Sequence, residues 1–423
     1  MGQYERGIHE VHQSIHYAFA LLLPARNRHS SAKILKDVLM AIETAQEACS
    51  GRLRFDPIRF LQQIVAIDSC DPPGSEIEVA KLVHAELLAL GIEAKLDEFL
   101  PGRANVLGRI CGTGEKPALL LSSHMDTVPV GTVPWRRPPF SGEIMEGRLY
   151  GRGSSDMKSA LAAMIATAGN LAEKRQMLKG DLILAFTAGE SANLLGARRF
   201  VEQGLKKEIG AFLCGEPSDL DIIIVEKAAL WLRATAKGRL GHVSGEPGIN
   251  AIDAIHSFLT HLYSLELECP PHPLLDGPTI RVGRIEGGSA VNLTPDHCVV
   301  DFDIRLPPGV DHRAVVTRVE NIAPEDVAIS ILDFKPAVES LPDDSFVKLC
   351  NDVCTRHRMR NPEIKGVSYY SDGTVLLEGL SVPFAIIGPG DLGLSGQPDE
   401  SVSIENVLKA VEIYQDVATA WLS

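Results

Sequence analysis

Apolar residues recur at helical spacing near the N-terminus of the chain. Ile8, Val11 and Ile15 begin the series, and a second stretch of the same kind reads "AKILKDVLMAIETAQEA". Because a period of three to four residues places apolar side chains on one face of a helix, the sequence predicts a helical extension over residues 1–52.

Three histidines, His9, His12 and His16, fall on one face of this predicted helix. They could form a metal-binding patch. A solvated or packed polar stripe is the simpler interpretation, because no carboxylate or cysteine motif accompanies them.

From residue 53 onward the pattern changes to short apolar runs that alternate with helical stretches. The runs include "ALLLSSHMDTV", "DLILAFTAG" and "AFLCGEPS", and "ALAAMIATAGNLA" is one of the helical stretches. Evenly apolar strands that alternate with helices are typical of a parallel sheet covered on both faces. We therefore expect an α/β domain with a mostly parallel sheet, formed by residues 53–224 and 339–423, whose ligands bind at the carboxyl ends of the strands.

The segment between these two parts has a different order of elements. Residues 225–338 read as strand, helix, two strands around a turn, helix and strand. This β-α-β-β-α-β order is the ferredoxin-like plan, so we expect a smaller α+β domain inserted into the first.

Length, net charge and cysteine pattern restrict the kinds of protein and partner that fit this sequence. A length of 423 residues agrees with two domains, and the net charge of −14 disfavours nucleic acid and anionic membrane surfaces as partners. The eight cysteines are scattered without a CxxC motif, as in proteins that keep reduced thiols. The N-terminus has no leader pattern, and its apolar run "YAFALLLPA" is too short to span a bilayer, so we expect a soluble cytoplasmic protein.

Four polar positions follow predicted strands or precede a helix. His124 and Asp126 stand on alternate positions after one strand, and Glu216 precedes a proline after another. Asp156 lies in a Gly-rich turn before a helix, where it serves either as a metal ligand or as a helix cap. Each of these signals is weak alone, because strand-end acids are common in loops.

Taken together, the segments resemble the zinc amidohydrolase family of acetylornithine deacetylase, succinyl-diaminopimelate desuccinylase, aminoacylases and carboxypeptidase G. The resemblance starts at about Phe55 and rests on motifs such as "SSHMDTVPV", "LYGRGSSDMK", "GHVSGEPGINAI" and "GPGDLG". It implies a two-zinc catalytic domain with an inserted ferredoxin-like lid through which two copies form a homodimer. By position, His124, Asp156 and Glu216 match the ligands of one zinc, and Asp126 matches the acid behind the histidine.

The stretch "AFTAGESANLLGARRF" departs from this family. The family has two adjacent glutamates there, a general base and a ligand of the second zinc; here Glu190 matches the base and Ser191 stands at the ligand position. Near the C-terminus the chain reads "LSGQPDE", with Gly396 where the family has a ligating histidine. Because neither replacement is a good zinc ligand, we expect one metal per subunit, most simply zinc, with cobalt or manganese as alternatives. His357, an N-terminal histidine or a substrate group could supply a substitute ligand.

The resemblance also assigns residues in the lid. His242 matches a histidine that reaches across the dimer to stabilise the developing oxyanion, and Asn292 and Arg305 match positions that bind the substrate's polar end and carboxylate. A structural salt bridge is the alternative for Arg305.

The sequence therefore predicts a metal-dependent hydrolase of the amide bond in an N-acyl amino acid or small peptide. The alternative, favoured by Ser191 and Gly396, is a repurposed member that binds a ligand or transfers an acyl group.

Overall fold

The computed structural model describes residues 55–242, 244–246, 248–358 and 361–423. The predicted extension over residues 1–52, with its three histidines, lies outside this part of the chain. Every element described below belongs to the compact unit Pro57–Ser423.

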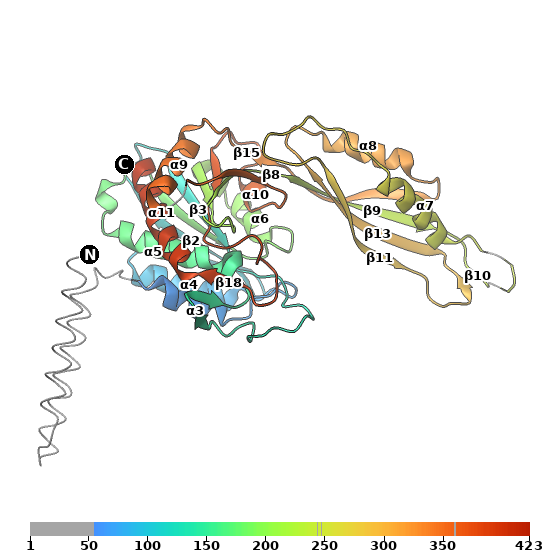
Figure 1. The fold of residues 1–423 in the computed structure, drawn as a ribbon, viewed down its shortest axis with the longest axis horizontal. Coiled ribbons are helices and arrows are strands. Elements are labelled where there is room, and N and C mark those ends of the chain that lie inside the picture. The colour runs from blue at the N-terminus through green and yellow to red at the C-terminus, as the bar shows by residue number, and fades with distance from the viewer. Residues whose placement is uncertain (1–54, 243, 247, 359–360) are drawn as a thin grey trace, which may run out of the picture. The chain divides into compact units, whose positions relative to one another are not determined.

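A nine-stranded mixed sheet contains the predicted α/β core (Figure 1). Its order is β1-β2-β6-β3-β7-β17-β8-β15, and β16 pairs with β8. The strands are β1 (Glu93–Leu100), β2 (Arg103–Ile110), β3 (Ala118–His124), β6 (Leu182–Thr187), β7 (Ile209–Cys214), β8 (Ile222–Glu226), β15 (Val338–Glu339), β16 (Ile364–Val367) and β17 (Phe384–Ile386). The central strands β6, β3, β7 and β17 are parallel, as expected, whereas β1, β2 and β15 add antiparallel pairs at the edges.

Helices cover this sheet because its central strands are apolar on both faces. Every residue of β6 and β8 is buried, and the alanine-rich helix α5 is buried along nearly its whole length. Helix α11 packs against α5 and α9, and α6 packs against β6 and α10. The helices are α3 (Pro57–Val65), α4 (Ile77–Ala89), α5 (Ser159–Ala172), α6 (Leu195–Glu202), α9 (Ser345–His357), α10 (Gly373–Leu376) and α11 (Ile404–Leu422), with short helical turns η1 (Ser154–Lys158), η2 (Arg175–Met177) and η3 (Leu205–Glu208).

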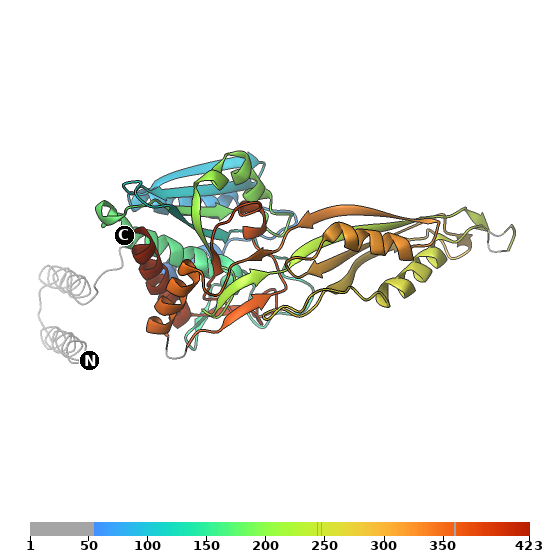
Figure 2. The same cartoon turned by 90° about the horizontal axis from the view of Figure 1, so that it is seen from above.

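A four-stranded antiparallel sheet of order β11-β13-β9-β14 follows β8, and α7 and α8 lie on one of its faces (Figure 2). The elements are β9 (Ala228–Lys237), α7 (Ala251–Tyr263), β11 (Thr279–Gly287), β13 (His297–Leu306), α8 (His312–Ile322) and β14 (Val327–Lys335). This is the predicted β-α-β-β-α-β order. Along β9, Leu230 and Leu232 are buried in the core under the helices, while Trp231 and Arg233 alternate with them and lie on the other face.

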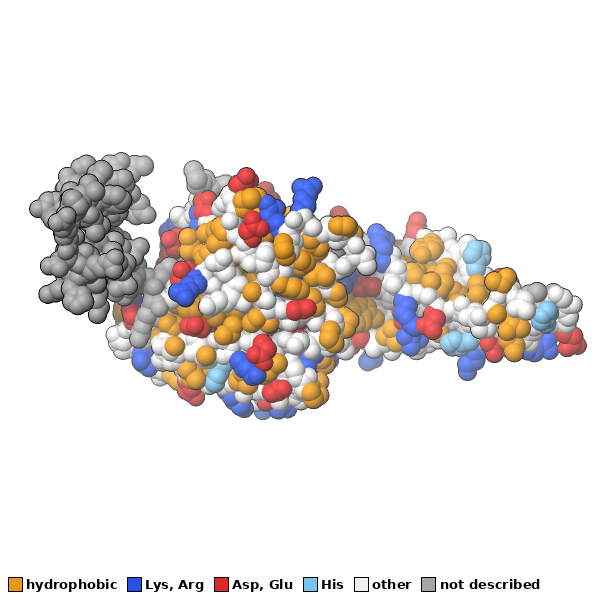
Figure 3. Space-filling model, turned by 90° about the horizontal axis from the view of Figure 1, so that it is seen from below, with side chains coloured by type: hydrophobic (Ala, Val, Ile, Leu, Met, Phe, Trp, Pro, Cys, Tyr) orange, Lys and Arg blue, Asp and Glu red, His pale blue; other side chains and the backbone are white. Residues whose placement is uncertain are grey.

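Two small sheets complete the described structure. They consist of β10 (Gly241–His242) with β12 (Leu293–Thr294), and of β18 (Ser401–Ser403) with β5 (Arg148–Tyr150) and β4 (Ile144–Met145). Charged side chains of both signs are interspersed on the face shown in Figure 3. Among the described helices, none has the length and apolar character needed to cross a membrane.

Candidate metal centre

Three ligand candidates meet at the carboxyl ends of adjacent strands. His124 is the last residue of β3, and Glu216 follows the end of β7 by two residues. Because β3 and β7 are parallel neighbours, with Ser122 opposite Cys214, both side chains emerge at the same edge of the sheet. Asp156 reaches this edge from η1, the turn that leads into α5.

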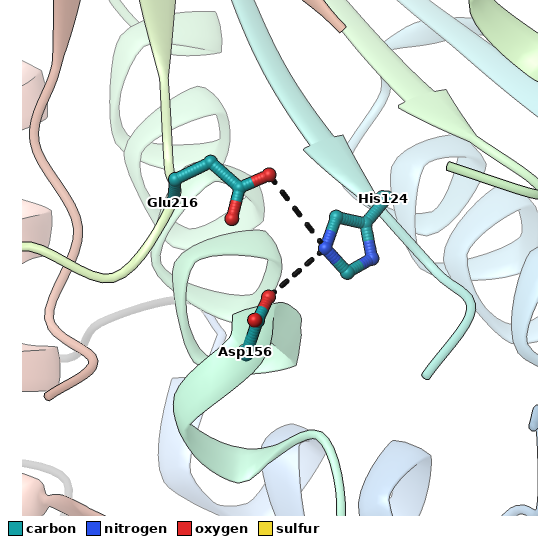
Figure 4. Close-up of side chains that lie close together, drawn as sticks. All are labelled: His124, Asp156 and Glu216. Atoms are coloured by element: carbon teal, nitrogen blue, oxygen red, sulfur yellow. Dashed lines mark hydrogen bonds and ion pairs between the residues drawn. The ribbon is translucent and has the colours of Figure 1, made fainter. Parts of the chain in front are cut away.

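The two carboxylates face the same ring nitrogen of the histidine (Figure 4). His124 Nε2 lies 3.0 Å from Asp156 Oδ1 and 3.7 Å from Glu216 Oε1. One ligand atom from each of the three residues lies within 4.8 Å of the others. On the far side of the ring, Nδ1 donates a hydrogen bond to the main-chain oxygen of Asp126 at 2.9 Å, which leaves Nε2 to face the carboxylates.

The charges at this site are unbalanced. Burial lowers the pKa of His124, but the surrounding carboxylates, with Glu216 first, outweigh burial and raise it well above its usual value. Burial together with the neighbouring Asp156 raises the pKa of Glu216 well above the usual value for a glutamate. A divalent cation would relieve this crowding of carboxylates.

A buried ion pair fixes the turn that carries Asp156. Glu400 Oε1 accepts hydrogen bonds from the main-chain N–H groups of Ser155 and Asp156 at 2.9 and 3.1 Å. Glu400 Oε2 pairs with Arg152 at 2.6 Å, and both side chains are almost fully buried. The ligand therefore stands on a rigid support, although Glu400 was not among the residues that the sequence singled out.

Glu190 lies on the turn after β6 and lines the same cavity as the three ligand candidates. Burial raises its pKa well above the usual value, against the opposing effect of His124. A half-buried carboxylate with a raised affinity for protons has the character that a general base needs.

Asp126 lies behind the histidine and also contacts the turn that carries Glu190. Its carboxylate oxygen lies 3.8 Å from His124 Nδ1, and the hydrogen bond to Nδ1 is accepted by its main chain. The carboxylate accepts instead from the N–H groups of Glu190 and Ser191, at 3.0 and 3.1 Å, and from the Ser191 hydroxyl at 2.8 Å. Its side chain therefore holds the turn that presents Glu190.

The cavity has a volume of about 330 Å³. Arg305 from β13 reaches it, donates to Asp303 Oδ1 at 2.8 Å and lies over the Tyr370 ring at 4.9 Å. The loop "GPGDLG", one of the motifs on which the family resemblance rests, contributes Leu392. Further lining residues that the sequence analysis did not single out are Pro217, Tyr369, Tyr370 and Ser395.

The two positions expected to have lost their metal-binding side chains differ in what surrounds them. Ser191 donates its hydroxyl to Asp126, as described above. Gly396 has a left-handed backbone, with φ of +71°, and its carbonyl oxygen accepts from Arg152. The neighbouring Ser395 donates its hydroxyl to Asp156 Oδ2 at 2.5 Å. The only hint of this contact in the sequence is that a serine stands next to the position where the family has a histidine.

His357 does not supply a substitute ligand, so that alternative is wrong. It lies at the end of α9, where Nε2 contacts Asp416 Oδ2 at 2.9 Å and Nδ1 contacts Glu412 Oε2 at 3.2 Å, both on α11. The histidine is engaged by that helix, because its two ring nitrogens already face these two carboxylates.

His242 and Asn292 lie together but not in the cavity lining. The Asn292 amide nitrogen is 3.4 Å from His242 Nε2, and both residues are exposed. Arg305 pairs with Ala229 at one end of β9, whereas His242 comes after Lys237 at the other end. At ~3.3 Å per residue, β9 separates these ends by about 25 Å, so His242 and Arg305 of one chain do not serve one small-molecule site.

The ligand candidates of the first metal and the positions expected to hold a second metal differ in the donor atoms that they offer. His124, Asp156 and Glu216 combine one imidazole with two carboxylates, a donor set suited to zinc at an open site. At the second position, Ser191 and Ser395 place hydroxyl groups against the carboxylates, and Gly396 has no side chain. Hydroxyl groups are poor ligands for zinc, so these three positions offer no good zinc ligand.

The sequence and fold match known proteins over most of their length. The model of the peptidase family M20/M25/M40 matches residues 120–420. A probable succinyl-diaminopimelate desuccinylase from Staphylococcus epidermidis is 26% identical over 400 residues, covering 87% of this chain and 98% of the relative. An acetylornithine deacetylase from Vibrio cholerae is 28% identical over 354 residues, covering 80% and 90% of the two chains.

The fold is that of solved members of the same family. The crystal structure of a dinuclear metal-binding M20 peptidase from Bacillus subtilis matches with a TM-score of 0.67 at 17% identity, over 86% of this chain and 97% of the other. The chain therefore belongs to the peptidase family M20/M25/M40, a family of amide-bond hydrolases.

Proposed function

We propose that this chain is a single-metal amidohydrolase that cleaves the amide bond of an N-acyl amino acid or small peptide. The observation that carries the proposal is the convergence of His124, Asp156, Glu216 and Glu190 on one cavity. The first three would hold one zinc ion. When bound, zinc supplies Lewis acidity toward the amide carbonyl and toward water.

Glu190 is the proposed general base. Its carboxylate removes a proton from the attacking water and delivers that proton to the nitrogen of the leaving amine. The raised pKa of Glu190 supports both transfers, because a group that holds a proton more firmly than an ordinary carboxylate is a stronger base and still a usable acid.

Arg305 is the proposed site for the substrate carboxylate. It reaches the cavity, and its planar donors can form two parallel hydrogen bonds with a carboxylate. Asp303 accepts from Nε and the main-chain oxygen of Ser368 accepts from Nη1 at 3.3 Å, so Nη2 and the second hydrogen of Nη1 are the donors proposed for the substrate.

We further propose that residues 225–338 act as a lid and that the chain works as a homodimer. The exposed pair of His242 and Asn292 would then enter the cavity of a second copy, where His242 stabilises the oxyanion that develops on the amide carbonyl. The separation of about 25 Å along β9 supports this assignment, because it keeps the pair away from the cavity of its own chain.

A cytoplasmic location is part of the proposal. All seven cysteines in the described part of the chain are free thiols, as expected in a reducing compartment.

The test is a hydrolysis screen of N-acetyl and N-succinyl amino acids and dipeptides with the full chain. Each substrate is paired with the analogue whose carboxylate is amidated. We expect hydrolysis that a chelator abolishes, and about tenfold or greater preference for the free carboxylate, which Arg305→Met removes. If metal-loaded protein hydrolyses none of these amides but binds them or transfers their acyl groups, the proposal is wrong and the repurposed alternative holds.

A further inference from the structure

The turn that carries Glu190 is held by side chains from other segments. Gly189 N–H donates to Glu76 Oε1 at 3.1 Å, and the next two N–H groups, of Glu190 and Ser191, donate to the Asp126 carboxylate. Three consecutive main-chain donors thus end on two buried carboxylates. The carbonyl oxygens of Gly189 and Glu190 accept from Leu195 and Leu194, so the carboxylates hold the N–H side of a turn whose carbonyl side is bound by the next segment.

The carboxylates behind the turn are crowded. Asp71, Glu76 and Asp126 are all buried, and one oxygen of each lies within 4.8 Å of the others. Arg103 lies among them: its two terminal nitrogens contact both oxygens of Asp71 at 2.8 Å, and one of them contacts Glu76 Oε1 at 3.1 Å. Because the guanidinium already supplies the positive charge, this cluster is an ion-pair network and not another metal site.

Arg103 also packs directly against the turn. A Cβ atom added to Gly189, whose φ is +65°, would lie 2.6 Å from Arg103 Nη1 and 3.3 Å from the Leu195 side chain. The turn therefore has no room to move toward the guanidinium.

Glu76 uses only one of its oxygens. Oε1 accepts from both Gly189 N–H and Arg103, whereas Oε2 has no hydrogen-bond partner among the described residues. A glutamine at this position would keep the oxygen that makes both contacts, and an aspartate would withdraw it by one methylene group.

We propose that Glu76 and Arg103 are positioning residues for the general base: they fix the Gly189–Ser191 turn so that the Glu190 carboxylate faces the metal ligands. The inference rests on the proposed role of Glu190. A displacement of the base by about 1 Å is enough to lower turnover by about a hundredfold.

The test compares Glu76→Asp with Glu76→Gln in the full-length metal-loaded protein. For Glu76→Asp we expect amide hydrogen exchange over residues 186–194 to become about tenfold faster, and kcat to fall by about ten- to a hundredfold. KM should stay within about twofold and the metal content should not change, because neither Arg305 nor the metal ligands are altered. Glu76→Gln should stay within about threefold of wild type in both exchange and kcat.

Arg109→Met provides a control at another ion pair of the same strand. Arg109 lies on the same strand β2 as Arg103 but near its other end, where it pairs with Asp181 at 2.7 Å just before β6 begins. We expect this variant to leave kcat and exchange over residues 186–194 within about twofold of wild type.

Two results would overturn the inference. One is wild-type exchange and kcat in folded Glu76→Asp. The other is equal damage by Glu76→Gln, which would mean that the charge matters and not the hydrogen bond to the turn. The exchange measurement shows whether Glu76 fixes the turn even if the wild-type protein hydrolyses nothing in the screen. That outcome of the screen would refute only the proposed function.

Discussion

The Ser395 hydroxyl donates a hydrogen bond to Asp156 Oδ2, the carboxylate oxygen that does not contact His124 Nε2. Asp156 is thus shared between an imidazole on one oxygen and a neutral hydroxyl on the other. The Ser191 hydroxyl has the corresponding relationship to Asp126. Ser191 stands at, and Ser395 beside, a position where the family resemblance places a ligand of a second metal, which supports the proposal of one metal.

Restoring the missing side chains should restore the second metal. We expect Ser191→Glu combined with Gly396→His to raise the metal content from about one to about two ions per chain. The left-handed backbone at position 396 should cost about 1–2 kcal/mol in the free energy of unfolding. Elemental mass spectrometry measures the first effect and denaturant unfolding the second.

The same double variant reports on the natural reaction. A large gain in amidase activity would mean that the natural chain is not optimised for hydrolysis. A metal content that stays at one would contradict the assignment of these two positions.

Glu190→Gln should remove hydrolysis and keep the metal. Because the amide cannot accept the proton of water, we expect kcat to fall by about 10²–10⁴-fold. Glu202→Gln, on the exposed end of α6, is the control and should have wild-type turnover. The test is to measure kcat and metal content on the same samples. Unchanged turnover in Glu190→Gln would refute the general-base assignment.

Mixed dimers test the proposed exchange of His242 between subunits. We expect His242→Ala and Glu190→Gln each to be inactive alone. When the two variants are co-expressed, half of the dimers are mixed and each mixed dimer has one complete site, so about a quarter of wild-type activity should return. Activity assays on the unselected mixture measure this recovery. Mixed dimers isolated through two different tags should have about half of wild-type activity, and inactivity of these dimers would contradict the exchange.

Buried Glu226 makes stability depend on pH. Burial raises its pKa from about 4.5 to about 8, although the charge of Arg305 opposes this shift. Between these values the folded state holds a proton that the unfolded state has lost, so stability falls as pH rises through this range and the full cost is present above about pH 8.

Glu226→Gln should remove this cost. We expect the variant to gain on the order of a few kcal/mol in unfolding free energy at pH 9 relative to wild type, and to show no such gain at pH 4. Glu378→Gln, which changes an exposed side chain, should not alter the pH dependence. The measurement is denaturant unfolding at the two pH values. An equal difference in unfolding free energy between Glu226→Gln and wild type at both pH values would contradict the account.

Local patterns in the sequence predicted the central strands, and the family resemblance singled out the three residues, His124, Asp156 and Glu216, that the structure brings together. β3, β6 and β7 are evenly apolar, and their ends carry the polar residues that meet at one edge of the sheet. β1 was not identified because "EAKLDEFL" is half charged and lies on an edge, where one face meets solvent.

Local patterns do not predict contacts between segments that are far apart in the sequence. Ser395 lies 239 positions from Asp156, and Glu400 lies 244 positions from the same residue, so no spacing rule connects them. Histidine is a common metal ligand, but His357 lies at the end of α9, where it contacts α11 and does not line the cavity.

The most direct test of the central claim is the metal content per chain, measured by elemental mass spectrometry on full-length protein purified without chelator and assayed in parallel for amide hydrolysis. The account predicts close to one zinc per chain together with turnover of an N-acyl amino acid or dipeptide. Two metals per chain, or no metal and no turnover, would contradict it.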